Sequence, residues 1–377
     1  MNKSFDLAVV GAGIIGLSCA RAAALQGLRV VVIDRDARSN GASVRNFGFV
    51  SVTGQERGTA WTRARLTCTI WEEVARQAGV TITQRGLWMM ARRPEAVSVL
   101  EAFVRTEMGE GCRILSRAAA TSRCRELAGA DLQAVLESSI ELRVESREAV
   151  PKIAAWLAER YGVVFLPQTA VLSVEPPRLE TSRGVVNAGA AVVCPGDDVA
   201  SLFPEQIAKY NVTRCKLQML RLADPGFRLP GVLMSDLGLV RYAGFSALPE
   251  AAALRERLAA EQGRHLQHGI HLIAVQSSDG TLVVGDSHHY AQTADFFADE
   301  RVDRLILDEF AAATGRPPSA VRERWMGTYA SCTDRSMFID APARNVRIVM
   351  ITSGSGASTG FAIGEEVVAE LFGWSEA

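Results

Sequence analysis

Residues 5–34 read FDLAVVGAGIIGLSCARAAALQGLRVVVID, and this stretch decides the fold. The apolar run 5–10 predicts a buried parallel strand, and residues 14–25 predict a helix that ends at Gly27. Residues 28–33 predict a second buried strand. A strand, a helix and a strand in this order form a βαβ unit, the start of a doubly wound sheet.

The turn between strand and helix carries the pattern Gly-x-Gly-x-x-Gly, at residues 11–16. Gly11 permits the tight turn, Gly13 lets the backbone approach a pyrophosphate, and Gly16 lets the helix pack closely on the sheet. The free N–H groups of the helix start favour the phosphates. Asp34 ends the second strand, where a carboxylate can bind a ribose hydroxyl. The sequence therefore predicts a dinucleotide site.

Length and composition limit the number of domains, the partners and the cellular location that we expect. The 377 residues favour two domains, and the formal net charge of −1 gives no reason to expect nucleic acid or an anionic membrane as partner. Seven dispersed cysteines without a CxxC pattern predict reduced thiols, a cytoplasmic location and no metal site. The apolar run 7–25 contains three regularly spaced glycines and follows an acidic residue, so we expect neither a signal peptide nor a membrane span.

The rest of the chain predicts alternating helices and strands. Helices are expected at about 58–77, 151–161, 248–268, 299–313 and from 363, with a helical, charged segment at 92–139. Strands are expected at 87–91, 141–144, 163–166, 190–194, 217–222, 239–242, 272–276, 282–286 and 346–351. Residues 278–280, Ser-Asp-Gly, predict a hairpin between two of these strands.

These elements predict an α/β fold with two domains. A Rossmann-like dinucleotide-binding domain is expected from residues 1–85, 145–215 and 322–377. An α+β substrate domain, built on a mostly antiparallel sheet, is expected from residues 86–144 and 216–321.

Three features favour FAD over NAD. The βαβ unit begins at residue 5, no second complete glycine motif is present, and a second glycine cluster, GSGASTG, occupies residues 354–360. We expect this cluster to direct a helix N-terminus at the flavin ring, where the helix dipole stabilises negative charge. An ordinary strand-to-helix turn is the alternative.

Together, GAGIIG, the strand ending in Asp34 and the terminal SGSGASTGFAIGEEV resemble the D-amino-acid oxidase superfamily, in particular glycine oxidase and monomeric sarcosine oxidase. The resemblance implies that a neutral amine binds beside FAD and passes a hydride from its C–N carbon to flavin N5. The imine then hydrolyses, and oxygen or another acceptor reoxidises the flavin. Such chemistry requires positioning more than a dedicated acid or base, so we expect no catalytic residue beyond the flavin.

The resemblance also implies roles for single residues. Arg45 falls where sarcosine oxidase has a carboxylate-binding arginine; a surface arginine or a pyrophosphate partner is the alternative. Tyr329 stands where glycine oxidase has a second arginine, and Ser358 stands where sarcosine oxidase has a lysine. Thr328 occupies the position of flavin-attaching cysteines, so non-covalent FAD is expected despite the nearby Cys332.

RNFGF at 45–49 and GDSHHY at 285–290 resemble a narrower branch associated with aminophosphonate breakdown. This resemblance implies a small anionic amine as substrate, such as 2-aminoethylphosphonate or its N-methyl form. A histidine at a strand end that faces solvent is the alternative for His288. The substrate-binding candidates are Arg45, Arg241, Tyr242, Gln276, His288, Tyr329 and Arg335.

The cofactor-binding candidates follow from the same comparison and the two glycine motifs. They are Gly11, Gly13, Ile14, Ile15, Gly16, Asp34, Arg35, Ser43, Asn46, Phe47, Gly48, Val171, Cys194, Gly196, Gly354, Ser355, Gly356, Ser358 and Thr359.

Three other functions stay open from the sequence. A glycine, sarcosine or D-amino-acid oxidase would use the same cofactor with a carboxylate substrate. A flavin monooxygenase is suggested by the GD-x-x-H pattern at 285–288, although no glycine-rich helix start follows it. A flavin sensor without activity would retain both glycine motifs and lack an open substrate pocket.

Overall fold

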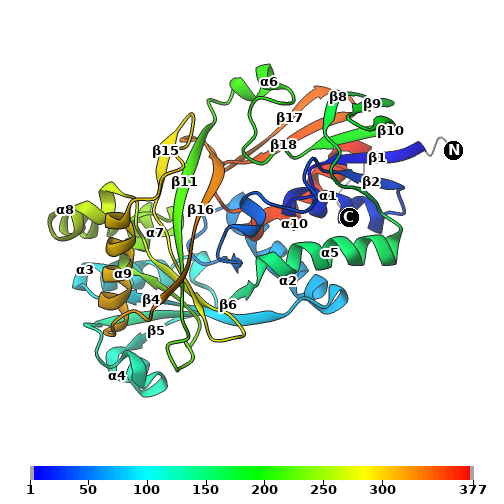
Figure 1. The fold of residues 1–377 in the computed structure, drawn as a ribbon. Coiled ribbons are helices and arrows are strands. Elements are labelled where there is room, and N and C mark those ends of the chain that lie inside the picture. Colours follow the sequence, from blue (N-terminus) through cyan, green and yellow to red (C-terminus); the bar gives the residue numbers. More distant parts are fainter. Residues whose placement is uncertain (1–3, 374–377) are drawn as a thin grey trace.

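The computed structural model describes residues 4–373, whose strands form two sheets (Figure 1). The first sheet has the order β17-β18-β10-β1-β2-β7, with a β8–β9 hairpin on β10. Its parallel centre consists of β1 (Ser4–Val10), β2 (Val30–Ile33), β7 (Val164–Leu166), β10 (Gly184–Val193) and β18 (Val346–Ile351). The antiparallel additions are β17 (Met337–Ala343), β8 (Val171–Glu175) and β9 (Arg178–Thr181).

Four helices pack together beside this sheet. They are α1 (Ile14–Leu25), α2 (Thr59–Ala78), α5 (Ser146–Tyr161) and α10 (Gly356–Phe372). Their apolar side chains and those of β1 and β2 form one buried core. Gly364 lets α10 lie directly on α1, because a Cβ at this position would come 2.5 Å from the carbonyl carbon of Ser18. The last helix of the chain is thus packed on the first.

The second sheet has ten strands in the order β15-β11-β14-β13-β12-β4-β6-β3, with β16 paired to β11 and β5 paired to β6. Its pairs are antiparallel except for β4 with β12. The strands are β3 (Phe49–Val50), β4 (Ile82–Ala91), β5 (Cys112–Ser116), β6 (Ala134–Val144), β11 (Thr213–Leu222), β12 (Val232–Ser235), β13 (Ile273–Gln276), β14 (Leu282–Gly285), β15 (His289–Ala291) and β16 (Val321–Ser331).

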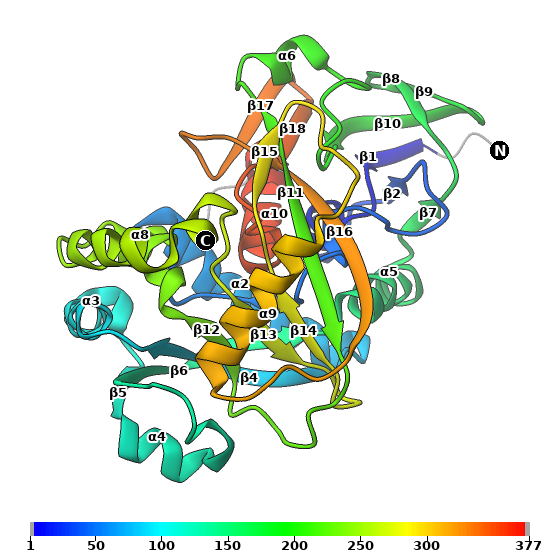
Figure 2. The same ribbon diagram turned by 60° about the vertical axis from the view of Figure 1, so that its left-hand side comes forward.

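Helices lie around the second sheet, and the turned view shows α9 running across β11 and β14 (Figure 2). These helices are α3 (Pro94–Val104), α4 (Arg117–Arg123), α7 (Ala243–Ser246), α8 (Ala251–Gln267) and α9 (Glu300–Thr314). The short α6 (Pro204–Ala208) precedes β11. Residues 4–373 also contain four 3₁₀ turns: η1 (Ala42–Val44), η2 (Glu107–Gly109), η3 (Arg125–Leu127) and η4 (Asp236–Val240).

The predicted fold class is confirmed: a Rossmann-like parallel sheet is joined to a mostly antiparallel substrate-domain sheet. The expected domain boundaries stay a prediction. None of the helices between residues 4 and 373 combines the length and apolar character that crossing a bilayer requires.

Three expected elements were wrong. Residues 239–242 form no strand, because the buried strand ends at Ser235 and the chain turns into η4. The segment 92–139 is only partly helical and contains β5 and the start of β6, whose mixed polar and apolar residues hid the strand pattern. The final helix begins at Gly356 rather than at 363, since its first turns consist of small residues that the glycine pattern assigned to a loop.

Candidate active site

One cavity of about 620 Å³ connects the two sheets. At one end lie Gly13 and Gly16 of the first glycine loop, together with residues 353–358 of the second. At the other end lie residues of β16, residues 241–243 after η4, and residues at or beside the ends of β13 and β14. The cavity therefore extends from a nucleotide-type loop into the substrate domain.

The first glycine loop has the geometry that its sequence predicts. Gly11 adopts a φ of +104°, and a Cβ there would come 2.5 Å from the carbonyl oxygen of Cys194. A Cβ at Gly13 would come 2.9 Å from Oγ of Ser43 and would fill the space at the helix start. Both positions thus require glycine, one for its backbone conformation and one for an open approach.

Two polar side chains accept hydrogen bonds from the backbone of the first glycine loop. The carboxylate of Asp34 accepts hydrogen bonds from the N–H groups of Ala12 (2.6 Å) and Asp36 (2.8 Å). The hydroxyl of Ser43 accepts one from the N–H of Ile14 (2.9 Å), in the first turn of α1. Asp34 lies at the end of β2, where a ribose hydroxyl would approach, and Ser43 lies where a phosphate would.

The second glycine loop reaches the cavity between β18 and α10. Gly354 adopts a φ of +72°, and a Cβ there would come 3.2 Å from Cζ of Tyr329 in β16. The buried hydroxyl of Ser358 accepts a hydrogen bond from the N–H of Ser51, and the carbonyl of Ala357 accepts one from the indole N–H of Trp71. These contacts fix the N-terminus of α10 against the cavity.

These features fit FAD. The first loop offers an open helix start beside Ser43 and a carboxylate at the end of β2, and the second offers another helix N-terminus further along the same cavity. A long dinucleotide needs such an extended site with two polar ends.

The substrate-domain end of the cavity is rich in hydrogen-bonding side chains. Arg241 follows η4 and donates a hydrogen bond from its guanidinium to the hydroxyl of Tyr290 (3.0 Å). The hydroxyl of Tyr242 lies 3.0 Å from Nε2 of His271. The ring of Tyr329 lies 6.4 Å from the ring of His288, between this group and the second glycine loop.

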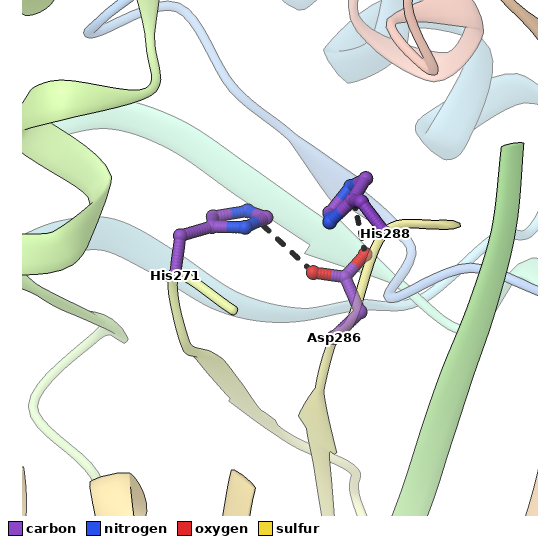
Figure 3. A group of neighbouring side chains, drawn as sticks. All are labelled: His271, Asp286 and His288. Atoms are coloured by element: carbon purple, nitrogen blue, oxygen red, sulfur yellow. Dashed lines mark ion pairs between the residues drawn. The ribbon is translucent and has the colours of Figure 1, made fainter. Parts of the chain in front are cut away.

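Asp286 lies between two histidines at this end (Figure 3). Burial raises the pKa of its carboxyl to about 7, although the nearby Arg241 opposes the rise. Burial, with Arg241 as the second cause, lowers the pKa of His271 and of His288 well below the usual value. Both imidazoles are therefore neutral at pH 7.

The cavity brings together most of the predicted residues. From the substrate set it is lined by Arg45, Arg241, Tyr242, His288, Tyr329 and Arg335. From the cofactor set it is lined by Gly13, Ile14, Ile15, Gly16, Ser43, Asn46, Phe47, Cys194, Gly196, Gly354, Ser355, Gly356 and Ser358. Gly11, Asp34, Arg35, Gly48, Val171 and Thr359 lie outside this lining.

Four predicted residues have partners that bear on their roles. Gln276 lies outside the cavity, and its side-chain amide bonds the backbone of Phe227, Leu229 and Gly280. Arg335 is paired with its neighbour Asp334, and Arg35 is paired with Asp198. Arg45 donates a hydrogen bond to Asn40 at the exposed side of the cavity.

Sequence reasoning missed His271 and Asp286, although the predicted hairpin contains the signal. In this hairpin Ile273 pairs with Gly285, and Ala274 pairs with Val284. Continuing that register outward places His271 beside the chain that carries Asp286 and His288. Three polar residues at the open end of a short apolar hairpin were therefore bound to meet.

The structure thus joins a parallel sheet with a dinucleotide-type loop to a second, mostly antiparallel sheet at one cavity. The family model described as "DAO: FAD dependent oxidoreductase" matches residues 6–371. The chain belongs to this family, and it is an FAD-dependent enzyme. No curated protein sequence matches it.

Several solved structures share the fold at low sequence identity. Glycine oxidase from Bacillus cereus ATCC 14579 is 15% identical, with a TM-score of 0.79, covering 99% of this chain and 96% of that one. Iminodiacetate oxidase from Chelativorans sp. BNC1 is 18% identical, with a TM-score of 0.73 and coverages of 98% and 96%. L-α-Glycerophosphate oxidase from Mycoplasma pneumoniae, with FAD bound, is 13% identical, with a TM-score of 0.74 and coverages of 98% and 95%.

Proposed function

We propose that the protein oxidises the C–N bond of a small amine that carries an anionic group. The observation that carries this proposal is the single cavity, which joins the FAD loops to an end centred on Arg241. The names of two structural neighbours, glycine oxidase and iminodiacetate oxidase, refer to amines with carboxylate groups.

FAD supplies the acceptor for the two electrons of the amine when it is bound. The chain has three tasks around it. Ser43 and the open helix start beside Gly13 receive the phosphates. The N-terminus of α10 provides positive potential at the far loop. The substrate end holds the amine in one orientation, which is the main requirement for this type of transfer.

Arg241 is the best-placed group for the substrate anion. It lies in the cavity with a hydroxyl partner and no ion-pair partner among the described residues, so its positive charge is available to a ligand. A guanidinium can bind a carboxylate or phosphonate with two parallel hydrogen bonds. Arg45 is a second cation at the exposed side of the same cavity.

We propose a phosphonate as the preferred anion. Tyr329 and Ser358 replace two cations that the resemblance implies for carboxylate substrates, while hydroxyl and imidazole groups accompany Arg241. A phosphonate has three oxygens and benefits from several such donors. The name of a further neighbour, glycerophosphate oxidase, refers to a phosphate group on the substrate. This supports 2-aminoethylphosphonate or its N-methyl form.

An oxidase for glycine, sarcosine or a D-amino acid is the second candidate, which the neighbour named glycine oxidase supports. A flavin monooxygenase is less well supported, because residues 285–288 lie at the end of β14 in the substrate sheet and not at a cofactor-binding helix start. The family favours an enzyme over a flavin sensor.

Anaerobic flavin bleaching tests the proposal. The yellow protein is mixed with 2-aminoethylphosphonate, its N-methyl form, glycine, sarcosine and D-alanine, and absorbance near the flavin maximum is followed. Ethylphosphonate, which lacks the amine, and ethylamine, which lacks the anion, are the matched controls. We expect fastest bleaching with an aminophosphonate. Faster bleaching by glycine or sarcosine would contradict the phosphonate preference, and no bleaching by any amine would contradict the function.

A further inference from the structure

Three buried side chains of one hairpin converge in the wall of the cavity (Figure 3). His271 precedes β13, and Asp286 and His288 follow β14. Nε2 of His271 lies 3.5 Å from Oδ1 of Asp286, and Nε2 of His288 lies 3.7 Å from Oδ2. Their ligand atoms all lie within 4.8 Å of one another.

The outer hydrogen bonds of both histidines leave Nε2 as an acceptor. Nδ1 of His288 lies 2.9 Å from the carbonyl oxygen of Gly269. Because a carbonyl only accepts, Nδ1 carries the proton and Nε2 presents a lone pair. Nδ1 of His271 faces the same carbonyl at 3.5 Å, and its Nε2 can accept the hydrogen bond of the Tyr242 hydroxyl. An imidazole held by Nδ1–H to a carbonyl is the usual arrangement of a metal-ligating histidine.

Asp286 adds a buried carboxyl group whose hydrogen bonding is incomplete. Only 5% of the residue is exposed, and its Oδ1 has no hydrogen-bond partner. The distances to the two Nε2 atoms are too long for direct hydrogen bonds. Two imidazole nitrogens and the buried carboxyl group of Asp286 thus face one another at distances too long for direct hydrogen bonds, an arrangement that a cation between them would satisfy in place of the carboxyl proton and the Tyr242 hydroxyl.

We propose that His271, Asp286 and His288 bind a divalent transition-metal ion in the wall of the cavity. Two imidazole nitrogens and one carboxylate are a ligand set suited to Zn²⁺ and related ions and unsuited to Mg²⁺, which prefers oxygen. Bonds of about 2.0–2.2 Å require the three side chains to draw together and the Tyr242 hydroxyl to leave Nε2 of His271. Three protein ligands leave a coordination position open to the cavity.

The open position gives the ion a role at the substrate, and this step rests on the proposed function. Its occupant is an oxygen of the substrate anion, held between the metal and Arg241. The ion and Arg241 together outweigh the single negative charge of Asp286, so this end of the cavity matches a dianionic phosphonate better than a carboxylate.

Gly269 holds the two histidines of the cluster, His271 and His288, in position. It adopts a φ of +61°, and a Cβ there would come 2.8 Å from Cβ of His288. Its carbonyl contacts both histidines. Gly269 is therefore a positioning residue, because any side chain would displace His288.

Zinc binding to the FAD-loaded protein tests the site. The tag-free protein is treated with a chelator, dialysed against Zn²⁺ or Mg²⁺, and its metal content is measured by mass spectrometry. We expect about one equivalent of Zn²⁺ and no Mg²⁺. His271→Ala, Asp286→Asn and His288→Ala should weaken Zn²⁺ binding by more than the ~10–100-fold typical for loss of an outer partner. FAD content and circular dichroism check folding, and Asp286→Asn retains the shape of the side chain.

His289→Ala is the matched control, because His289 pairs with His268 outside the cluster. It should leave Zn²⁺ binding unchanged. A wild-type protein that retains no Zn²⁺, or a control that loses it as the cluster variants do, would overturn the proposal. Amine-dependent flavin bleaching of the wild type is read separately, so failure of the metal site is distinguishable from failure of the proposed function.

Discussion

The carboxylate of Asp34 accepts a hydrogen bond from the N–H of Ala12 at 2.6 Å, and this contact connects the end of β2 to the glycine loop after β1. Asp34 accepts a second bond from the N–H of Asp36. The residue therefore shapes the loop in addition to its predicted contact with the ribose.

Asp34→Ala should weaken FAD retention by about 1–3 kcal/mol, the cost of leaving polar partners unpaired. Equilibrium dialysis with FAD measures this loss. Arg38→Ala, in the same exposed segment, serves as a comparison that should bind FAD normally. Unchanged FAD affinity in Asp34→Ala would remove the acid from the site.

Arg241→Met should raise the KM of the anionic amine strongly while the protein stays yellow. The lost charge-assisted contact is worth about 2–4 kcal/mol, or roughly 30- to 1000-fold in kcat/KM. Arg45→Met should have a smaller effect, because hydroxyl and imidazole groups accompany Arg241 in the cavity, whereas the partner of Arg45 is Asn40. Steady-state kinetics of both variants show which arginine binds the substrate anion. The reverse order would make Arg45 the principal anion anchor.

Acid or heat should release FAD from the protein. Burial raises the pKa of the Cys332 thiol, which donates a hydrogen bond to the carbonyl of Tyr210, so it is a poor nucleophile. Thr328 offers no thiol at the other candidate position. Absorbance of the supernatant and pellet after acid precipitation measures release. A yellow pellet that turns colourless in Cys332→Ser would show a covalent bond instead.

Gly364→Ala should lower the free energy of unfolding by about 1–3 kcal/mol, the usual cost of forcing atoms into a packed contact. The added Cβ meets the backbone of Ser18. Gly263→Ala in α8 is the control, since its Cβ would enter open space. Urea unfolding measures the stability of both variants. Equal urea midpoints for the wild type and Gly364→Ala would contradict the close packing of α10 on α1.

The sequence predicts the ends of the molecule better than its middle. The glycine loop at 11–16 and the strand ending at Ile33 can be placed because their spacing admits one backbone conformation. β16 was not expected, since three consecutive charged residues at 322–324 and Gly327 interrupt its strand pattern. The cofactor end of the site was predictable for the same reason as the glycine loop, because the spacing of its glycines indicates its backbone conformation. His271 and Asp286 were missed because nothing next to them in the sequence marks them, and only the register of the predicted hairpin between β13 and β14 brings them together.

The cofactor cavity is built from both ends of the chain, with Gly13 on one side and Gly354 on the other. During synthesis the segment with Gly13 leaves the ribosome early and the segment with Gly354 leaves it late. The dinucleotide loop is made early, but the flavin end of its site does not exist until α10 has been synthesised and has docked on α1. A chain whose synthesis stops before Gly354 should therefore be unable to hold the flavin and should be colourless.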